Sequence, residues 1–401
     1  EGGIFDIKLD IKTTQDETLL AFFETLFKQA ICRANYTDEI SYESVMEVLR
    51  WLSKSGIDLN QQTCFGKVPL QFCLDQYGGD LNILRLLLES GANPSLVKLD
   101  DRHFNKAWYY GSGFYMKGRF LFERGAVTNN LNGLLHLALR NRDLDFASTL
   151  ISRHHADPAS ILKLHYSRSK IMYEESALCI AAETGMEEVN FVLRHLHLRY
   201  PSVPQPTFIT PDAYIAAAYS GSEDVTRLFL ELDPSALRAN ILGITALHVA
   251  AEEGHYGVCQ LLLPRLSGEA FLQQYPTPLH LAIRKNHREV VQLFIENGVD
   301  VNSKGTGIIS NYMEHREKPR TPLQEAMQHS HFSSCISDLL SAGADYSGVA
   351  IYEAAKRGGG AAPKQVQDGL GKLAGYEMLL GPLNFDQNNQ NNGQVRLATF
   401  S

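Results

Sequence analysis

Hydrophobic and polar positions follow a two-part pattern along this chain, and the pattern recurs about every 33 residues. In each unit, a short apolar segment is followed by a second apolar segment with helical spacing, as at residues 81–94. The leading apolar residues of the units are Leu70, Phe104, Leu135, Leu178, Tyr214, Leu247, Leu279 and Leu323, with Ile351 as a candidate ninth. The pattern predicts one pair of helices per unit.

Turn residues and small residues agree with this prediction. The segments SGAN, NGVD and AGAD each place a Gly just past a predicted helix end, where a left-handed residue is favoured. A small residue, such as Ala181 or Ala250, follows the leading apolar residue by three positions and lets the first helices of neighbouring units approach closely. No unit can bury its apolar face alone, so stacking must supply the core. The expected fold is an all-α solenoid.

Four segments repeat one motif in altered form. They are SALCIAAETGM at 176–186, TALHVAAEEGH at 245–255, TPLHLAIRKNH at 277–287 and TPLQEAMQHSH at 321–331. The chain resembles ankyrin repeats, whose signature is T-P-L-H-x-A. The resemblance covers roughly residues 45–355 and about eight or nine units. It implies helix-turn-helix units with extended β-hairpin-like loops, curved around a concave binding face.

Three predicted regions and two inserts organise the chain. Residues 1–44 are expected to form an N-terminal helical cap, 45–355 the repeat array, and 356–401 a C-terminal capping helix with a polar tail. The unit at 101–131 lacks the TPLH motif and is degenerate. Inserts near 155–175 and 303–320 lengthen two units, and they are either functional loops or tolerated surface insertions.

Composition excludes some classes of function. The net charge of −8 over 401 residues argues against a general nucleic-acid-binding protein. No apolar run reaches about 18 residues, so no membrane span is expected, and the start lacks the pattern of a secretory signal. Six scattered cysteines without a CxxC pair favour reduced thiols and a cytoplasmic protein.

Candidate chemistry is sparse. Cys64 lies on a predicted loop and could be paired with His103 or His136 as a nucleophile and its base, but no oxyanion motif accompanies it. The segments RHH at 153–155 and RHLHLR at 194–199 could suggest a metal, although cations at helix ends explain them equally simply. We therefore predict no enzyme activity, no cofactor and no metal site.

The family resemblance assigns roles to several polar residues. It implies that the TPLH histidines His136, His248 and His280 hold loops through backbone hydrogen bonds. It also marks Asn60 as a candidate for hydroxylation by a cytosolic oxygenase, because Leu52, Asp58 and Leu59 match the spacing of such sites. The alternative is that Asn60 is a turn asparagine.

The resemblance also predicts a partner-binding surface from loop tips and first-helix ends. Its predicted residues are Met172, Tyr173, Phe208, Ile209, Tyr219, Ile241, Leu242, Ile244, Glu252, Glu253, Arg284 and Lys285. The apolar tips would form an exposed strip, a feature that often marks a contact site. The alternatives are that the tips fold inward and that the four charged residues pair with one another.

These observations predict a non-enzymatic, monomeric adaptor that binds another protein on its concave face. The irregular units, the inserts and the Asn/Gln-rich tail are loosely similar to ankyrin-repeat effectors of intracellular bacterial pathogens, which would act in the host cytosol. The alternative function is the ankyrin targeting portion of an enzyme, either a cysteine protease or a ubiquitin-ligase adaptor.

Overall fold

A computed structural model describes residues 50, 58–62, 67–75, 81–110, 112–165, 172–238, 244–266, 274–304, 307–308, 320–328 and 333–345. The chain divides into two compact units, Glu1–Leu237 and Arg238–Ser401, and each is described by itself. The predicted cap at 1–44 and the predicted tail at 356–401 lie outside the described residues.

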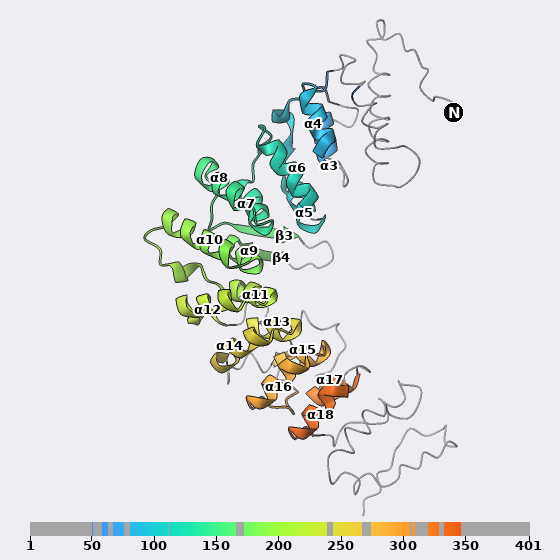
Figure 1. The fold of residues 1–401 in the computed structure, drawn as a ribbon, viewed down its shortest axis with the longest axis vertical. Coiled ribbons are helices and arrows are strands. Elements are labelled where there is room, and N and C mark those ends of the chain that lie inside the picture. Colours follow the sequence, from blue (N-terminus) through green and yellow to red (C-terminus); the bar gives the residue numbers. More distant parts are fainter. Residues whose placement is uncertain are drawn as a thin grey trace, which may run out of the picture. The chain divides into compact units, whose positions relative to one another are not determined.

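The first unit contains five helix pairs within its described residues. The pairs are α3 Pro69–Asp75 with α4 Leu81–Glu89, α5 Asp101–Tyr110 with α6 Ser112–Phe122, α7 Leu131–Arg140 with α8 Leu144–His154, α9 Ala177–Thr184 with α10 Met186–Arg199, and α11 Pro211–Ser220 with α12 Glu223–Leu232. From α5 to α11, the first helices of successive pairs pack side by side, and the second helices lie on the other side of the stack (Figure 1). The all-α solenoid predicted from the sequence is confirmed.

The second unit continues the same arrangement. Its described pairs are α13 Ala246–Glu253 with α14 Tyr256–Leu266, α15 Pro278–Arg284 with α16 Arg288–Glu296, and α17 Pro322–Gln328 with α18 Ser333–Ser341. Helix α15 packs between α13 and α17, while α16 packs between α14 and α18.

Local sequence sets where these helices begin and end. The side chains of Thr210 and Thr245 act as N-caps and accept hydrogen bonds from backbone N–H groups three residues later. Gly221 and Gly254 follow the ends of α11 and α13 in the left-handed conformation, with φ of 72° and 81°. These caps fix the beginning and the end of α11 and α13, and the first helices described by the structure are 7 to 10 residues long.

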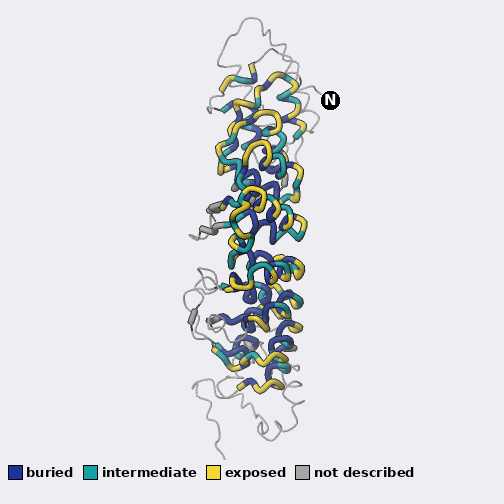
Figure 2. Tube along the Cα trace, turned by 90° about the vertical axis from the view of Figure 1, so that its left-hand side faces the viewer, coloured by how far each residue is buried: buried dark blue, intermediate teal, exposed yellow. Residues whose placement is uncertain are grey.

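Leucine and alanine build the core. The predicted small residues on the first helices are buried; Ala181, Ala217, Ala250, Ala282 and Ala326 are each 0% exposed. Figure 2 marks buried positions of this kind in dark blue along the middle of each stack. Small side chains at these positions let the first helices pack closely, as the sequence predicted.

The degenerate unit at 101–131 still forms a complete helix pair. Phe104 and Ala107 of α5 are buried at the positions that Leu and Ala occupy in regular units. Lys117 of α6 is also buried and stacks its ammonium 4.5 Å from the centre of the Phe114 ring. Burial of the apolar positions therefore preserves the pair although the TPLH motif is missing.

The insert at 155–175 contributes the two strands of the antiparallel β3–β4 hairpin, and residues 166–171 between the strands lie outside the described residues. Strand β3 Ile161–His165 pairs with β4 Met172–Ser176, with Ile161 opposite Ser176 and His165 opposite Met172. Short parallel bridges occur elsewhere, between β1 Lys98–Leu99 and β2 Val127–Thr128, and between β5 Gln274–Tyr275 and β6 Gly307–Ile308. The second insert, 303–320, contributes β6, while residues 309–319 lie outside the description.

Three short 3₁₀ helices complete the described loops. They are η1 Pro94–Leu96, η2 Gln205–Phe208 and η3 Pro234–Ala236. Among the described helices, none combines the length and the apolar character needed to cross a membrane.

Candidate protein-binding surface

An exposed tyrosine stands at the end of α11 in the first unit. Tyr219 is 57% exposed. The next residue, Ser220, donates a hydrogen bond from its hydroxyl to the carbonyl oxygen of Ala182 in α9, over 3.0 Å. This bond joins the ends of two neighbouring first helices. Tyr219 is thus a large, accessible aromatic side chain on a fixed part of the solenoid.

The loop before α11 does not present the apolar tip predicted from the sequence. Ile209 is only 4% exposed, so its predicted place in an exposed strip is wrong. Phe208 is half-buried, and its ring centre lies 5.9 Å from that of Tyr200. The loop folds back because η2 orders its residues, and the backbone N–H of Ile209 donates to Pro206. At this loop tip, the apolar side chain of Ile209 therefore folds inward, which was the alternative to an exposed strip.

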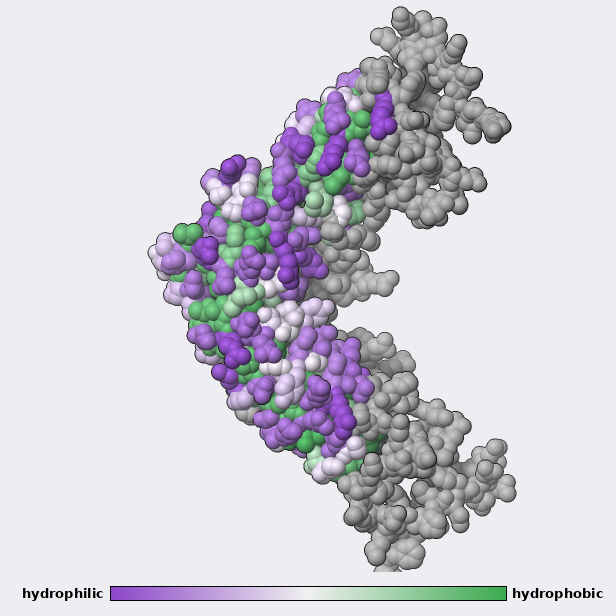
Figure 3. Space-filling view, in the orientation of Figure 1, coloured by the Kyte–Doolittle hydropathy of each residue, from purple (hydrophilic) through white to green (hydrophobic). Residues whose placement is uncertain are grey.

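The other predicted tips are described only in part. Met172 and Tyr173 lie in β4, opposite His165 and Leu164, and the structure does not describe their side chains. Ile241 and Leu242 lie outside the described residues. Ile244, just before α13, is half-buried. On the face drawn in Figure 3, hydrophobic residues gather in separate patches among hydrophilic ones.

Two of the predicted charged residues in the second unit form an exposed pair. Lys285 Nζ lies 3.6 Å from Glu252 Oε1, and the lysine side chain is 54% exposed. Glu253 is exposed at the end of α13. The pairing alternative raised from the sequence is therefore correct for Glu252 and Lys285. An exposed pair of this kind contributes little to stability.

Arg284 has a different role from its neighbour. Its Nε donates to Oε1 of Glu325 over 2.5 Å, and the Glu325 side chain is 1% exposed. Arg320 Nη1 lies 3.5 Å from the other oxygen of the same carboxylate. The guanidinium of Arg284 thus joins α15 to α17, and partner binding by Arg284 stays a prediction.

Two TPLH histidines contact the threonine of their own motif, and His280 also reaches a neighbouring loop, whereas the buried Nε2 of His248 has no hydrogen-bond partner. In His280, Nδ1 lies 2.7 Å from the Thr277 hydroxyl and Nε2 donates to the carbonyl of Arg320 over 2.8 Å. His248 contacts Thr245 in the same way, through Nδ1 at 2.8 Å. Burial lowers the pKa of His280 to about 4 and that of His248 to about 3, so both imidazoles are neutral. This confirms the structural role expected of His280.

The same Thr–His arrangement thus recurs in successive helix pairs. A family model described as ankyrin repeats (3 copies) matches residues 213–305 and 269–350. This chain contains ankyrin repeats. The helix pairs from α3 to α10 precede the matched ranges and keep the same two-helix arrangement. Ankyrin repeats indicate a protein–protein interaction module.

The helix pair α7–α8, which precedes the matched ranges, departs from the motif for a steric reason. Gly133 stands where the motif has Thr, two residues before Leu135. A Cβ atom on Gly133 would lie 2.8 Å from Cδ2 of Phe104. The large Phe104 of the degenerate unit therefore occupies the space of the missing threonine. His136 binds the Ser160 hydroxyl through Nε2 at 2.9 Å, while its buried Nδ1 has no hydrogen-bond partner.

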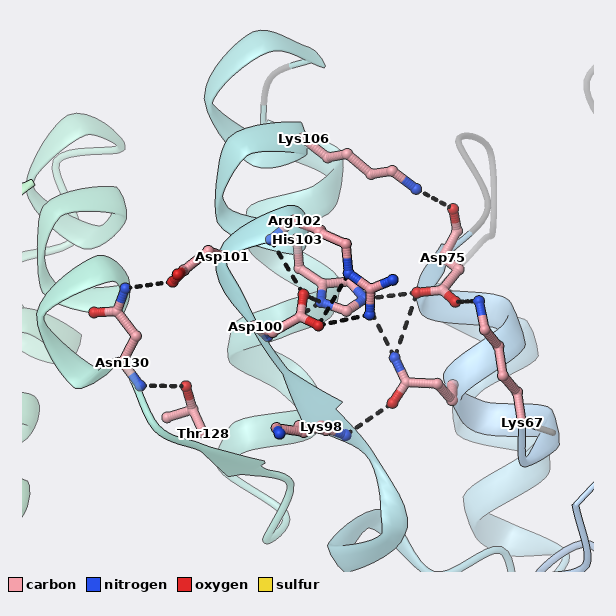
Figure 4. A network of polar contacts seen from close by, with 11 residues as sticks. Lys67, Asp75, Lys98, Asp100, Asp101, Arg102, His103, Lys106, Thr128 and Asn130 are labelled. Atoms are coloured by element: carbon pink, nitrogen blue, oxygen red, sulfur yellow. Dashed lines mark hydrogen bonds and ion pairs between the residues drawn. The ribbon is translucent and has the colours of Figure 1, made fainter. Parts of the chain in front are cut away.

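A polar network joins the first described helix pairs at the ends of their first helices (Figure 4). Asp75, the last residue of α3, receives an ion pair from Lys67 and a 2.6 Å hydrogen bond from Nε2 of His103 in α5. Burial alone would raise the pKa of Asp75, but the His103 and Lys67 hydrogen bonds hold it well below its usual range. Asn130 continues the network by donating to Asp101 over 2.7 Å. These contacts hold three successive units in register.

The cysteine and histidine candidates show no catalytic arrangement within the described residues. Cys64 lies outside them. Cys73, on the same helix as Asp75, is fully buried, and burial raises its thiol pKa. A buried thiol with a raised pKa is a poor nucleophile. Within this part of the chain, the Asp75–His103 pair is best explained as a contact between repeats.

The histidine-rich segments lie at helix ends. His154 is in the last turn of α8, and its ring centre lies 5.0 Å from that of Phe122. The ring centre of His195 in α10 lies 4.4 Å from that of Phe191, with the two rings tilted by 55°. The described residues contain no group of three or more His, Cys, Asp or Glu side chains placed to hold a metal ion.

Asn60 bridges two loops that lie 31 to 33 residues apart in the sequence. Its Nδ2 donates to the carbonyl of Gly91 over 3.2 Å, and its Oδ1 accepts from the backbone N–H of Asn93 over 2.6 Å. Asn302 makes the equivalent bonds to Gly343 and Asp345, at 3.2 and 2.6 Å. This geometry supports the turn-asparagine interpretation. Hydroxylation of Asn60 stays a prediction.

Asn60→Ala is expected to lower the free energy of unfolding by about 1–2 kcal/mol, because it removes two hydrogen bonds between units. Urea unfolding followed by circular dichroism measures the change. Asn302→Ala should have a similar effect, while Asn129→Ala, at an exposed loop position, should change stability by less than about 0.5 kcal/mol. Equal stability of the Asn60 and Asn129 variants would show that the bridge contributes nothing.

Proposed function

We propose that this chain is a non-enzymatic adaptor that binds a partner protein through the first-helix side of its ankyrin repeats, with Tyr219 as a central contact. The observation that carries the proposal is the 57% exposure of this aromatic side chain at a first-helix end. Tyrosine is enriched among the residues that dominate binding energy at protein interfaces. The expected partner is a protein, because the net charge of −8 disfavours nucleic acid.

The surroundings of Tyr219 suit a protein contact. On the neighbouring first helix α9, Glu183 is half-buried, and its Oε2 lies 3.8 Å from Arg140 Nη1 on α7. These side chains would form a polar border beside the aromatic contact, which is a common arrangement at interfaces. Rows of equivalent first-helix ends supply the additional area that a stable complex needs, since a specific interface buries about 1,200–2,000 Å² in total.

A capture experiment tests this proposal. The full chain, Tyr219→Glu and Leu198→Glu would each be used to retain proteins from a cytosolic lysate, with the retained proteins identified by mass spectrometry. Leu198 is the matched control, because it is 68% exposed and lies on the second helix α10. Both variants add one negative charge at an exposed apolar position.

Wild type and Leu198→Glu are expected to retain the same protein, and Tyr219→Glu is expected to bind it at least about 30-fold more weakly. Equal helical content and melting temperature of the three proteins is the control for folding. Retention that does not depend on residue 219, or that is lost equally in both variants, would contradict the proposed site.

We further propose that the chain is a translocated effector that acts on a host protein. The support for this proposal is the irregular set of units, the β3–β4 insert and the Asn/Gln-rich sequence after residue 380. Capture of a partner from host-cell lysate, and not from lysate of the organism that encodes the chain, is the outcome expected of an effector. Capture from the encoding organism alone would favour an adaptor of that organism.

A further inference from the structure

A buried carboxyl group connects the β3–β4 hairpin to the helices behind it. Glu175 lies in β4, opposite Leu162 of β3, and directly precedes Ser176, the N-cap of α9. Its Oε2 atom is buried and has no hydrogen-bond partner. The backbone N–H of Ala177 donates to Ser160 over 3.3 Å and closes the base of the hairpin. Glu175 as a whole is half-buried, so exposing Oε2 fully to water requires its side chain or this base to move.

The groups that face Glu175 come from three helices and are mostly acidic. They are Glu183 of α9, Asp212 of α11 and Arg140 of α7. Arg140 lies 3.8 Å from Glu183, so its positive charge is shared with that carboxylate. A negative charge on Glu175 would lie beside two other carboxylates, in a place where one of its oxygens receives no donor. Such a charge is costly in a buried position.

We propose that the β3–β4 hairpin is a pH-sensitive element, which is closed against α7 and α9 while Glu175 is protonated and loosens when Glu175 ionises. Loosening lets water reach Oε2 and separates the new charge from Glu183 and Asp212. The proposal concerns the hairpin alone and does not depend on the identity of a binding partner.

The direction of the pH effect follows from the environment of the group. Burial, with additional repulsion from Glu183 and Asp212 and partial compensation by Arg140, raises the pKa of Glu175 from 4.5 to about 7. Burial also raises the pKa of Glu183. Because the pKa of Glu175 is higher in the folded chain than in the unfolded chain, proton binding to Glu175 stabilises the closed form. This stabilisation is fully present at pH values below the unfolded pKa and is lost as the pH rises through the folded pKa. The closed hairpin is therefore favoured at mildly acidic pH.

Hydrogen–deuterium exchange on the full chain tests the proposal. Protection of the backbone amides at 161–165 and 172–176, corrected for intrinsic exchange rates, would be compared at about pH 5.5 and about pH 8, on either side of the transition. In wild type, hairpin protection is expected to fall about tenfold or more at the higher pH. Glu175→Gln keeps the shape and removes the charge, so its hairpin should stay protected at both pH values.

Two further variants distinguish the ionisation of Glu175 from general effects of charge on the exchange of the hairpin amides. Glu183→Gln removes a neighbouring carboxylate, so the loss of protection should become smaller and move to lower pH. Glu231→Gln, at an exposed position of α12, should behave as wild type. Equal pH-dependent loss in wild type and Glu175→Gln would overturn the proposal.

A direct titration keeps the proposal testable if Glu175→Gln does not fold. The carboxyl carbon of Glu175, assigned by NMR in the wild-type chain, should titrate with a midpoint near neutral pH. A midpoint near 4.5, the ordinary glutamate value, would overturn the proposal.

Discussion

Replacing Glu325 with glutamine is expected to lower the free energy of unfolding of the second unit by about 3–5 kcal/mol. The carboxylate of Glu325 is 1% exposed and lies between Arg284 and Arg320, at 2.5 and 3.5 Å. Glutamine keeps the shape but removes the charge, so two partly buried guanidinium groups each lose an ion pair. Because Arg284 belongs to α15 and Glu325 to α17, the change should separate neighbouring repeats.

Urea unfolding followed by circular dichroism measures this loss, and Lys285→Ala is the matched control. Lys285 directly follows Arg284 and pairs with Glu252 in an exposed position, so its removal should cost less than about 1 kcal/mol. A Glu325→Gln variant as stable as wild type would show that the Arg284 contact does not hold the repeats together. In that case Arg284 would again be a candidate for partner binding.

Gly254→Ala is expected to destabilise the second unit by about 2–3 kcal/mol, from two additive causes. Gly254 has a φ of +81°, a conformation that is unfavourable for alanine. An added Cβ would also overlap the ring of His287. That ring donates from Nε2 to the carbonyl of Glu252 over 2.8 Å, so its displacement would break a hydrogen bond between repeats.

Gly298→Ala separates the two causes. Gly298 has a similar φ of +73°, but an added Cβ would have no heavy atom within 4 Å. Gly298→Ala is therefore expected to lower the free energy of unfolding by about 1 kcal/mol, which is the cost of placing alanine at a positive φ. Thermal melting of both variants measures the difference. Equal losses would mean that His287 moves aside without cost and that its bond to Glu252 is unimportant.

Repetition explains why most of the fold could be predicted from the sequence. The small first-helix residue is buried from unit to unit, and several units add a threonine N-cap and a glycine C-cap, such as Thr245 and Gly254. A unit with a weak local signal can therefore be predicted from its neighbours. Even the degenerate unit was placed correctly, because Phe104 and Ala107 keep the burial pattern. In the next unit, Phe104 of the degenerate unit excludes a threonine at position 133. This exclusion depends on three-dimensional packing, so the sequence around residue 133 could not reveal it.

The surface was predicted less well because exposure depends on how loops fold. Phe208 and Ile209 are apolar in sequence, and only the conformation of η2 shows that Ile209 turns inward. Arg284 and Lys285 are adjacent and chemically similar, yet one pairs with a buried carboxylate and the other with an exposed one. The ion pair of Arg284 spans 41 residues, so local sequence could not reveal it.

The hairpin and its buried carboxyl group were missed for a related reason. The sequence showed only that the unit containing residues 155–175 was too long. Alternation in ILKLH gives a short strand signal, but the pairing of Glu175 with Leu162 requires the turn geometry. The charge environment of Glu175 comes from α7, α9 and α11, which are distant in the sequence.

Site-specific photo-crosslinking would show on which side of the repeats a partner binds. A photoreactive phenylalanine analogue placed at position 219 or at position 198 would be activated in cytosolic lysate, and the adducts identified by mass spectrometry. We expect a crosslinked partner protein from position 219 on the first-helix side and none from position 198 on α10. A partner crosslinked from position 198 but not from 219 would contradict the proposed function and place the binding surface on the second helices.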